Sequence, residues 1–311
     1  MHLPTHSLGR LTAAAAMACT AALTPVAALA ATGTAGQPIP VGGGPQVLAI
    51  TPNGTTAYVV NSGSGTVTPI STATNTAGNQ IPVGSFPWDI VITPNGKTVY
   101  VANAGSGTVT PIFTATNTAG TAIPVSGVSA IAITPNGRTV YVVGSGVVTP
   151  ISTATNTAGT PIKIPFSAGV SPAGAPGQML AVSTPDGKTV YVASQSADTV
   201  TPISTATNTA GKPIKVGEDP FTMAITPDGK VLEVVNQLSG TVTAIVTAVN
   251  RASPSITAGS TPSAIAITPN GKTAYVVNNG SGTVTPISIR TNRAGQTISV
   301  GSSPSAIAIS Q

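Results

Sequence analysis

The chain has 311 residues, of which only 6% are charged and 41% are hydrophobic, and its formal net charge is +5. Glycine and proline contribute 34 and 28 residues, so turns are frequent, but the aliphatic content is too high for a disordered chain. Aromatic residues make up 3%, so we expect a core built from Val, Ile and Ala.

The first 30 residues have the pattern of a secretory signal peptide. Arg10 precedes a segment rich in Ala and Leu, and Ala28-Leu29-Ala30 supplies small residues for cleavage. We therefore expect cleavage after Ala30 and a mature domain at 31–311 that is secreted or held at the cell surface. Two alternatives are open: a membrane anchor, which Pro25 and the short apolar run disfavour, and a lipoprotein acylated at Cys19.

The predicted cleavage limits the chemistry of the mature protein. It removes His2, His6 and Cys19, which are all the histidines and cysteines of the chain. The mature chain then has no disulfide, no thiol nucleophile and no imidazole base. No serine-hydrolase elbow or phosphate-binding glycine motif occurs either. The sequence therefore favours a non-catalytic protein, and we expect no cofactor and no metal.

A repeat organises the rest of the chain. The motif Thr-Pro-(Asn or Asp)-Gly recurs at intervals of 42, 41, 50, 42 and 42 residues, beginning at Thr51, Thr93, Thr134, Thr184, Thr226 and Thr268. Each repeat holds four short β-branched segments separated by turn residues, of the types 264–268, 273–278, 282–288 and 296–301. The second segment is apolar on both faces, which indicates sheets covered on both sides. This pattern predicts an all-β fold, a β-propeller of four-stranded antiparallel blades.

The second segments also carry a family resemblance. Residues 58–61 and 275–278 read Tyr-Val-Val-Asn and residues 100–103 read Tyr-Val-Ala-Asn, each followed by a glycine-rich turn and Thr-Val. These words resemble the YVTN family of β-propeller repeats over residues 37–311. The resemblance implies a secreted or surface-exposed propeller, commonly seven-bladed, whose function the fold does not fix.

The predicted strands do not fill a whole number of blades. Counting from Pro38–Val41 to a last strand ending at Ile309 gives 26 strands, or six complete repeats plus a partial seventh. The sequence leaves open whether the ring has six or seven blades. It predicts that the ring is weakest at the seam where its two ends, Pro38 and Gln311, meet.

One face of the predicted propeller carries most of the variation between repeats. In this fold the connections into the first strand and the turns between the second and third strands share a face, here named the top face. The position five residues before each turn motif varies, holding Gln46, Trp88, Ser129, Met179, Phe221, Ser263 and Ser305, and an insertion at 165–178 enters the same face. Variable loops on a rigid scaffold tend to bind, so we predict ligand contact at Trp88, Asp89, Phe221, Glu218 and Asp219. The alternative is that the aromatic residues pack between blades and the acids are solvated.

The opposite face, here named the bottom face, is predicted to be basic. The turn tips supply Lys97, Arg138, Lys188, Lys230 and Lys272. The other bottom corners add Lys212, Arg251, Arg290 and Arg293, against the two acids Asp186 and Asp228. Such a face suits an anionic polymer or a membrane surface, although cations at hairpin tips also serve solubility. No aromatic residues are interleaved with these cations, so we expect no nucleic-acid partner.

The sequence favours a secreted or cell-surface, non-catalytic binding or scaffolding module. We expect a monomer without a transmembrane segment in the mature chain, whose partner is a protein or an anionic cell-envelope polymer. The alternative is a lactonase-like small-molecule hydrolase with a divalent metal held by carboxylates in the channel, and a third reading is a structural protein without a discrete site.

The fifth repeat deviates, because Glu233 replaces the expected Tyr at a buried position, where a carboxyl group needs a partner or water.

Overall fold

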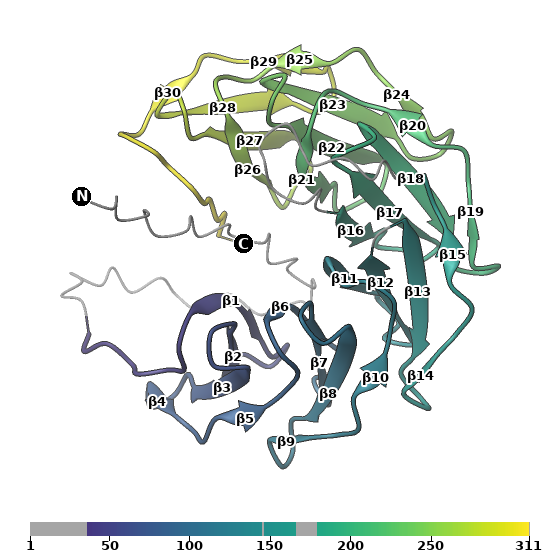
Figure 1. The fold of residues 1–311 in the computed structure, drawn as a ribbon. Coiled ribbons are helices and arrows are strands. Elements are labelled where there is room, and N and C mark those ends of the chain that lie inside the picture. Colours follow the sequence, from purple (N-terminus) through teal and green to yellow (C-terminus); the bar gives the residue numbers. More distant parts are fainter. Residues whose placement is uncertain (1–35, 145, 166–178, 311) are drawn as a thin grey trace, which may run out of the picture.

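The computed structural model describes residues 36–144, 146–165 and 179–310, which form six antiparallel sheets arranged around a common centre (Figure 1). The predicted signal peptide, Cys19 and most of the insertion at 165–178 lie outside the described residues. Each sheet corresponds to one sequence repeat. The structure therefore has the all-β architecture that the repeat predicts.

Three longer strands and two two-residue strands make up each sheet. The first two sheets comprise β1 (Pro45–Ile50), β2 (Thr56–Asn61), β3 (Thr66–Ser71), β4 (Thr76–Ala77), β5 (Ile81–Pro82), and β6 (Pro87–Ile92), β7 (Thr98–Asn103), β8 (Thr108–Phe113), β9 (Thr118–Ala119), β10 (Ile123–Pro124). The next two comprise β11 (Ala130–Ile133), β12 (Thr139–Gly144), β13 (Val147–Ser152), β14 (Thr157–Ala158), β15 (Ile162–Lys163), and β16 (Met179–Ser183), β17 (Thr189–Ser194), β18 (Thr199–Ser204), β19 (Thr209–Ala210), β20 (Ile214–Lys215). The last two comprise β21 (Pro220–Ile225), β22 (Val231–Asn236), β23 (Thr241–Val246), β24 (Arg251–Ala252), β25 (Ile256–Thr257), and β26 (Pro262–Ile267), β27 (Thr273–Asn278), β28 (Thr283–Ser288), β29 (Arg293–Ala294), β30 (Ile298–Ser299).

The outer edge of each sheet is interrupted rather than formed by one continuous fourth strand. In the first sheet β4 pairs with one end of β3 (Ile70 opposite Ala77) and β5 with the other (Val67 opposite Ile81). The break coincides with Pro69, which has no N–H to donate to a neighbouring strand, while its carbonyl accepts a 2.7 Å bond from the Gly78 N–H. Part of the segment predicted as a turn thus joins the edge. The predicted strand at 38–41 is wrong, because these residues form no strand.

The core lies between neighbouring sheets. Tyr100, Ala102 and Val109 of the second sheet, for example, form one buried cluster with Val140 and Val142 of the third. The second strands are buried on both faces, as their apolar pattern predicts. A single sheet therefore depends on its neighbours for the burial of its apolar side chains.

A tyrosine–asparagine bond joins successive sheets. The hydroxyl groups of Tyr58, Tyr100, Tyr141 and Tyr191 donate to the Oδ1 atoms of Asn117, Asn156, Asn208 and Asn250, each at 2.6 Å. Each asparagine belongs to the next sheet and has a φ between 49° and 54°, a conformation that Asn adopts more readily than most residues. Burial raises the pKa of Tyr100 and of Tyr191 to about 12, so both hydroxyl groups keep their protons at neutral pH.

The fifth and sixth sheets are not joined by this bond. Glu233 occupies the tyrosine position and is fully buried, opposite Ala224 and Ala244 on the flanking strands. Asn292 occupies the asparagine position with φ 48°. Within the described part of the chain, neither carboxyl oxygen of Glu233 nor Oδ1 of Asn292 has a hydrogen-bond partner. Burial accordingly raises the pKa of Glu233 to about 7.

The ring of sheets is open between the first and the sixth. Leu48 of β1 is 48% exposed, whereas its equivalents Ile90 and Ile131 are 6% and 5% exposed because a preceding sheet covers them. Beyond β30, residues 302–310 follow the place of a further first strand. Asn279 Nδ2 donates to the Pro304 carbonyl at 3.0 Å, and Ile307 packs against the sixth sheet. The structure therefore contains six complete sheets and a partial seventh.

Candidate ligand-binding face

The top face is built on a repeated left-handed residue. The residue two positions before the variable position of the top face has a positive φ wherever the structure describes it, namely Gly44, Phe86, Gly127, Asp219, Thr261 and Ser303. In the first, second, fifth and sixth repeats its carbonyl group accepts an N–H of the turn between the second and third strands, as in the 3.0 Å bond from Ala104 to Phe86. The two segments that the sequence assigns to the top face are therefore in direct contact.

An aromatic pair lies on this face in the second repeat. The rings of Phe86 and Trp88 are stacked, with centroids 5.8 Å apart and planes inclined by 14°. Phe86 is 52% exposed and has a φ of 50°, a conformation that costs a residue with a Cβ about 1 to 2 kcal/mol. Trp88 is half-buried. The pair presents apolar surface to solvent beside a rigid sheet.

Sequence reasoning missed Phe86. A signal was present, because Phe86-Pro87 stands where other repeats have Gly44-Pro45, Asp219-Pro220 or Thr261-Pro262. An aromatic residue at a position that otherwise holds small or polar residues marks a local departure from the repeat. The repeat pattern did not predict the positive φ at this position. Because bulky residues are unfavourable there, an aromatic residue at this position points to a functional role.

Asp89 points into the structure rather than out of it. Its Oδ1 accepts the N–H of Ile90 at 2.8 Å, and its Oδ2 accepts the N–H of Ile131 in the third sheet at 3.0 Å. Burial raises the pKa of Asp89 to about 6, although the two backbone bonds act in the opposite direction. The carboxyl group of Asp89, the residue after Trp88 on β6, thus bridges the second and third sheets.

The acids of the fourth-to-fifth connection form a separate group. Asp198 accepts the N–H of Asp219 through Oδ1 at 3.0 Å, and its Oδ2 lies 3.5 Å from Lys215 Nζ. Asp219 is buried with φ 57°, and its carbonyl accepts the N–H of Gln237 at 2.9 Å. Glu218 is exposed, and its N–H donates to Ser239 Oγ at 3.2 Å.

The structure brings the predicted top-face residues together only in part. Glu218 and Asp219 lie beside Asp198, and Phe221 follows them as a half-buried residue of β21. Asp89 lies on a different sheet. In the described ranges, no three acidic, histidine or cysteine side chains are grouped as ligands for one ion. The predicted site is therefore two places on one face, an aromatic one at Trp88 and an acidic one at Glu218.

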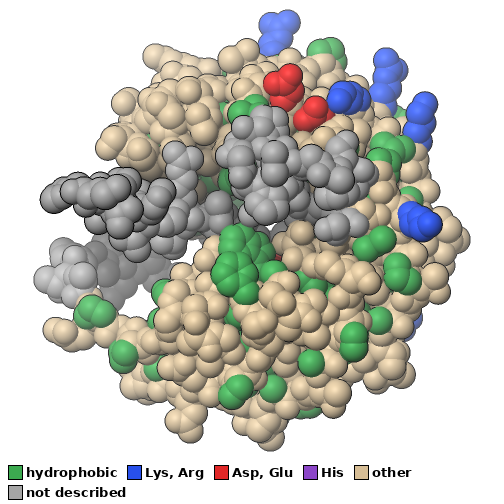
Figure 2. Space-filling model, in the orientation of Figure 1, with side chains coloured by type: hydrophobic (Ala, Val, Ile, Leu, Met, Phe, Trp, Pro, Cys, Tyr) green, Lys and Arg blue, Asp and Glu red, His purple; other side chains and the backbone are tan. Residues whose placement is uncertain are grey.

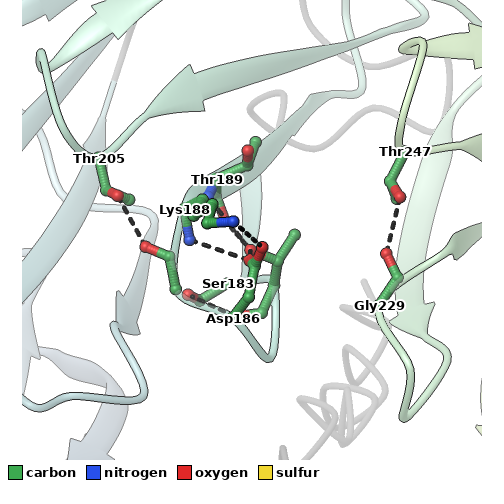
Figure 3. Close-up of polar contacts among 9 residues, drawn as sticks. Ser183, Asp186, Lys188, Thr189, Thr205, Gly229 and Thr247 are labelled. Carbon is green, nitrogen blue, oxygen red and sulfur yellow. Dashed lines mark hydrogen bonds and ion pairs between the residues drawn. The ribbon is translucent and has the colours of Figure 1, made fainter.

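The predicted basic residues lie at the tips of the turns between the first and second strands. Figure 3 shows one such turn, in which the Lys188 N–H donates to Asp186 Oδ1 at 3.0 Å and Lys188 Nζ lies 3.6 Å from Asp186 Oδ2. Lys230 Nζ lies 3.2 Å from Asp228 Oδ2 in the next repeat. A hydrogen bond from Thr184 and the backbone bond from Lys188 lower the pKa of Asp186, so it is ionised at neutral pH. These carboxylates offset the charge of two of the five tips.

The other three tips carry an uncompensated charge. Asn95, Asn136 and Asn270 occupy the position of the turn aspartate and accept the same backbone bond, as Asn95 Oδ1 does from the Lys97 N–H at 3.0 Å. As far as the structure describes the chain, Lys97, Arg138 and Lys272 have no carboxylate within ion-pair distance. No helix among the described residues is long and apolar enough to cross a membrane.

Comparisons with known proteins place the fold. No family model and no curated protein sequence matches the chain. Among solved structures, hydrazine synthase of Kuenenia stuttgartiensis is similar with a TM-score of 0.66 and 21% identity over 87% of this chain and 91% of that one. A functionally unknown protein from Desulfotomaculum acetoxidans is similar with a TM-score of 0.64 and 20% identity over 78% and 79% of the two chains. With its repeated antiparallel sheets and these structural neighbours, the chain is a β-propeller repeat protein of six complete sheets and a partial seventh.

Proposed function

We propose that the protein is a YVTN-like, secreted or cell-surface binding module that acts without catalysis. Its partner is a protein or an anionic polymer of the cell envelope. The top face makes the contact with a protein, whereas the basic turn tips are the surface that suits a polymer. The export step rests on the signal-like residues 1–30. The family assignment rests on the Tyr-Val-Val-Asn words of the second strands.

The observation that carries the proposal is the aromatic pair on an otherwise repetitive scaffold. The second and third strands of the repeats differ little, whereas on the top face Phe86 and Trp88 replace residues that are small or polar in most other repeats. An exposed Phe in the left-handed region is unfavourable for folding, and such positions tend to cluster where a protein binds. Aromatic residues are also the side chains that contribute most to binding surfaces. Asp89, the residue after Trp88, holds β6 to the third sheet through its bond to Ile131.

The test measures the fraction of purified protein that binds to isolated cell envelopes and to intact cells of the producing organism. Phe86→Ser and Trp88→Ser introduce the residue that Ser303, Ser263 and Ser305 provide at equivalent positions. We expect each change to weaken binding about tenfold, which corresponds to roughly 1.4 kcal/mol.

Phe113→Ser is the matched control, because Phe113 is also an exposed aromatic residue but lies at the end of β8. It should leave binding unchanged. Equal binding by all three variants would show that the top-face pair is not the contact, and a wild-type protein that binds neither preparation would contradict the proposed function itself.

A further inference from the structure

An open groove lies on the outer side of the molecule between the fourth and fifth sheets. It has a volume of about 460 Å³. Residues 211–215 with Pro202 form one wall, and residues 249–252 form the other. Three of the lining residues are cations: Lys212 and Lys215 beside β20, and Arg251 on β24. Pro202, Pro213 and Ile214 supply apolar surface between them.

The same groove recurs between the second and third sheets without any charge. There it has a volume of about 610 Å³ and is lined by the equivalent residues, except that Phe113 takes part instead of the counterpart of Pro202. Thr121, Pro124 and Thr157 stand at the positions of Lys212, Lys215 and Arg251. The fold therefore supplies the groove in more than one place, whereas the sequence supplies three cations in this one.

The charge of the groove is only partly compensated. Lys215 Nζ lies 3.5 Å from Asp198 Oδ2, and both side chains remain in contact with solvent. Lys212 and Arg251 are exposed and, in the residues that the structure describes, have no carboxylate within ion-pair distance. Figure 2 shows Lys and Arg side chains along the side of the ring that carries β15, β20 and β24 in Figure 1, but not over the first two sheets in this view.

We propose that this groove binds anionic groups of an extended polymer that runs along the outer edge of the ring. Two lysines and one arginine line it from two sheets, and Arg is well suited to phosphate or carboxylate oxygens. The apolar residues between the cations accommodate the uncharged part of such a chain. This site is independent of the top-face contact, since it lies on different strands and uses none of the same residues.

The test is the binding of linear polyphosphate and of polyglutamate to the full chain at about 150 mM salt, where weak nonspecific attraction is screened. The triple variant K212T/K215P/R251T gives the groove the residues of its uncharged counterpart. The control triple K97Q/R138Q/K272Q removes the same charge from the turn tips. We expect the groove variant to lose at least about tenfold in affinity and part of its salt dependence, and the control to lose less than about twofold.

The outcomes separate the possibilities. If wild type binds polyphosphate more tightly than polyglutamate, the recognised group is phosphate; the opposite order identifies carboxylate. Either conclusion requires that the groove variant loses this binding. Equal losses in both triples would mean that net charge alone attracts the polymer, and the absence of binding by either polymer would also overturn the proposal. The single variants K212T and R251T, which change exposed side chains, provide the same comparison should the triple fail to fold. Failure here leaves the Phe86 and Trp88 test unaffected.

Discussion

At the scale of single residues, Glu233 is the clearest departure from the repeat. A tyrosine at this position would reach the next sheet and donate a hydrogen bond, as the Tyr191 hydroxyl group does to Asn250 Oδ1. The shorter Glu233 leaves Asn292 Oδ1 without a donor among the described residues. A buried carboxylate without a partner is unfavourable, so the folded state favours the neutral carboxyl group.

We predict that Glu233 makes stability depend on pH. Its pKa is about 7 in the folded protein against an ordinary value of 4.5, so folding favours the protonated form. The contribution is complete below about pH 4.5 and is lost as the pH rises through about 7, a difference of roughly 3 kcal/mol in the free energy of unfolding. Urea unfolding at pH 4.5, 6 and 8 measures it.

Glu233→Gln is the control, because it keeps the shape and cannot ionise. Asp89, whose pKa is also raised, to about 6, contributes to both proteins, so the difference between wild type and variant isolates Glu233. The two curves should diverge towards high pH, with the variant more stable. Parallel curves would mean that water reaches the carboxyl group.

Gly144 is a second single-residue departure, at the end of β12. Four of the other five repeats have Asn there, and the fourth repeat has Ser194. The Asn side chain packs against a glycine of the top face: a Cβ on Gly84 would lie 2.7 Å from Asn103 Cγ. In the third repeat the glycine is on the strand instead, and a Cβ on Gly144 would lie 2.2 Å from the Gly127 carbonyl oxygen. The glycine that allows the close approach is therefore on the second strand in this repeat, whereas it is on the top-face connection in the second repeat.

Restoring the motif by Gly144→Asn is therefore expected to destabilise the protein by about 3 kcal/mol, because the side chain would meet backbone atoms that cannot move aside. Thermal unfolding checks this. Asn103→Gly, which creates space instead of a clash, is the comparison. A stabilised Gly144→Asn would contradict the packing described for this turn.

At the scale of strands, the outer edge of the fifth sheet shows a coupled change. In most sheets a proline of the third strand contacts a glycine of the edge, and a Cβ on Gly211 would lie 3.0 Å from Pro202 Cγ. In the fifth sheet the proline position holds Ala244 and the glycine position holds Ser253, whose N–H donates to the Ala244 carbonyl at 2.8 Å. The smaller residue on the strand leaves room for the larger one on the edge.

We predict that Ala244→Pro, although it restores the repeat, lowers the free energy of unfolding by about 1 to 3 kcal/mol through a clash with Ser253. Adding Ser253→Gly should recover most of this loss. A double-mutant cycle measured by urea unfolding gives the coupling between the two positions. Additive effects of the two changes would show that the contact does not link them.

The strands were predictable from the sequence to different degrees. The second strands, such as Thr98–Asn103, are apolar on both faces and are bounded by turn residues, so their pattern was sufficient to predict them as strands buried on both faces. The outer strands are two residues long and depend on pairing with the third strand, which local sequence does not encode.

The top-face site was predicted around Trp88, but its exposed partner Phe86 depends on a backbone conformation that the residues around it do not reveal. The inward bonds of Asp89 depend on the neighbouring sheet, which a single repeat cannot show.

At the scale of the whole molecule, the opening in the ring makes equivalent residues unequal. Leu48 on β1 is exposed, whereas Ile131, at the same position of the third sheet, is buried between neighbours. We expect Leu48→Ala to cost less than about 1 kcal/mol and Ile131→Ala to cost about 3 kcal/mol, because only the second leaves a cavity. Thermal unfolding of the two variants checks this, and equal losses would mean that another surface covers β1 in solution.

The interrupted outer edge of each sheet bears on aggregation. A long, flat strand edge with free N–H and C=O groups recruits strands from other molecules, and this chain has few charges to prevent it. The outer edge consists of two-residue strands that are interrupted opposite a residue of the third strand. In five sheets this residue is a proline, namely Pro69, Pro111, Pro150, Pro202 and Pro286, and such short strands offer little edge for recruitment. The interrupted edge thus protects a weakly charged, β-rich protein from polymerising through its rim, and the fifth sheet keeps the same interruption although Ala244 stands in place of proline.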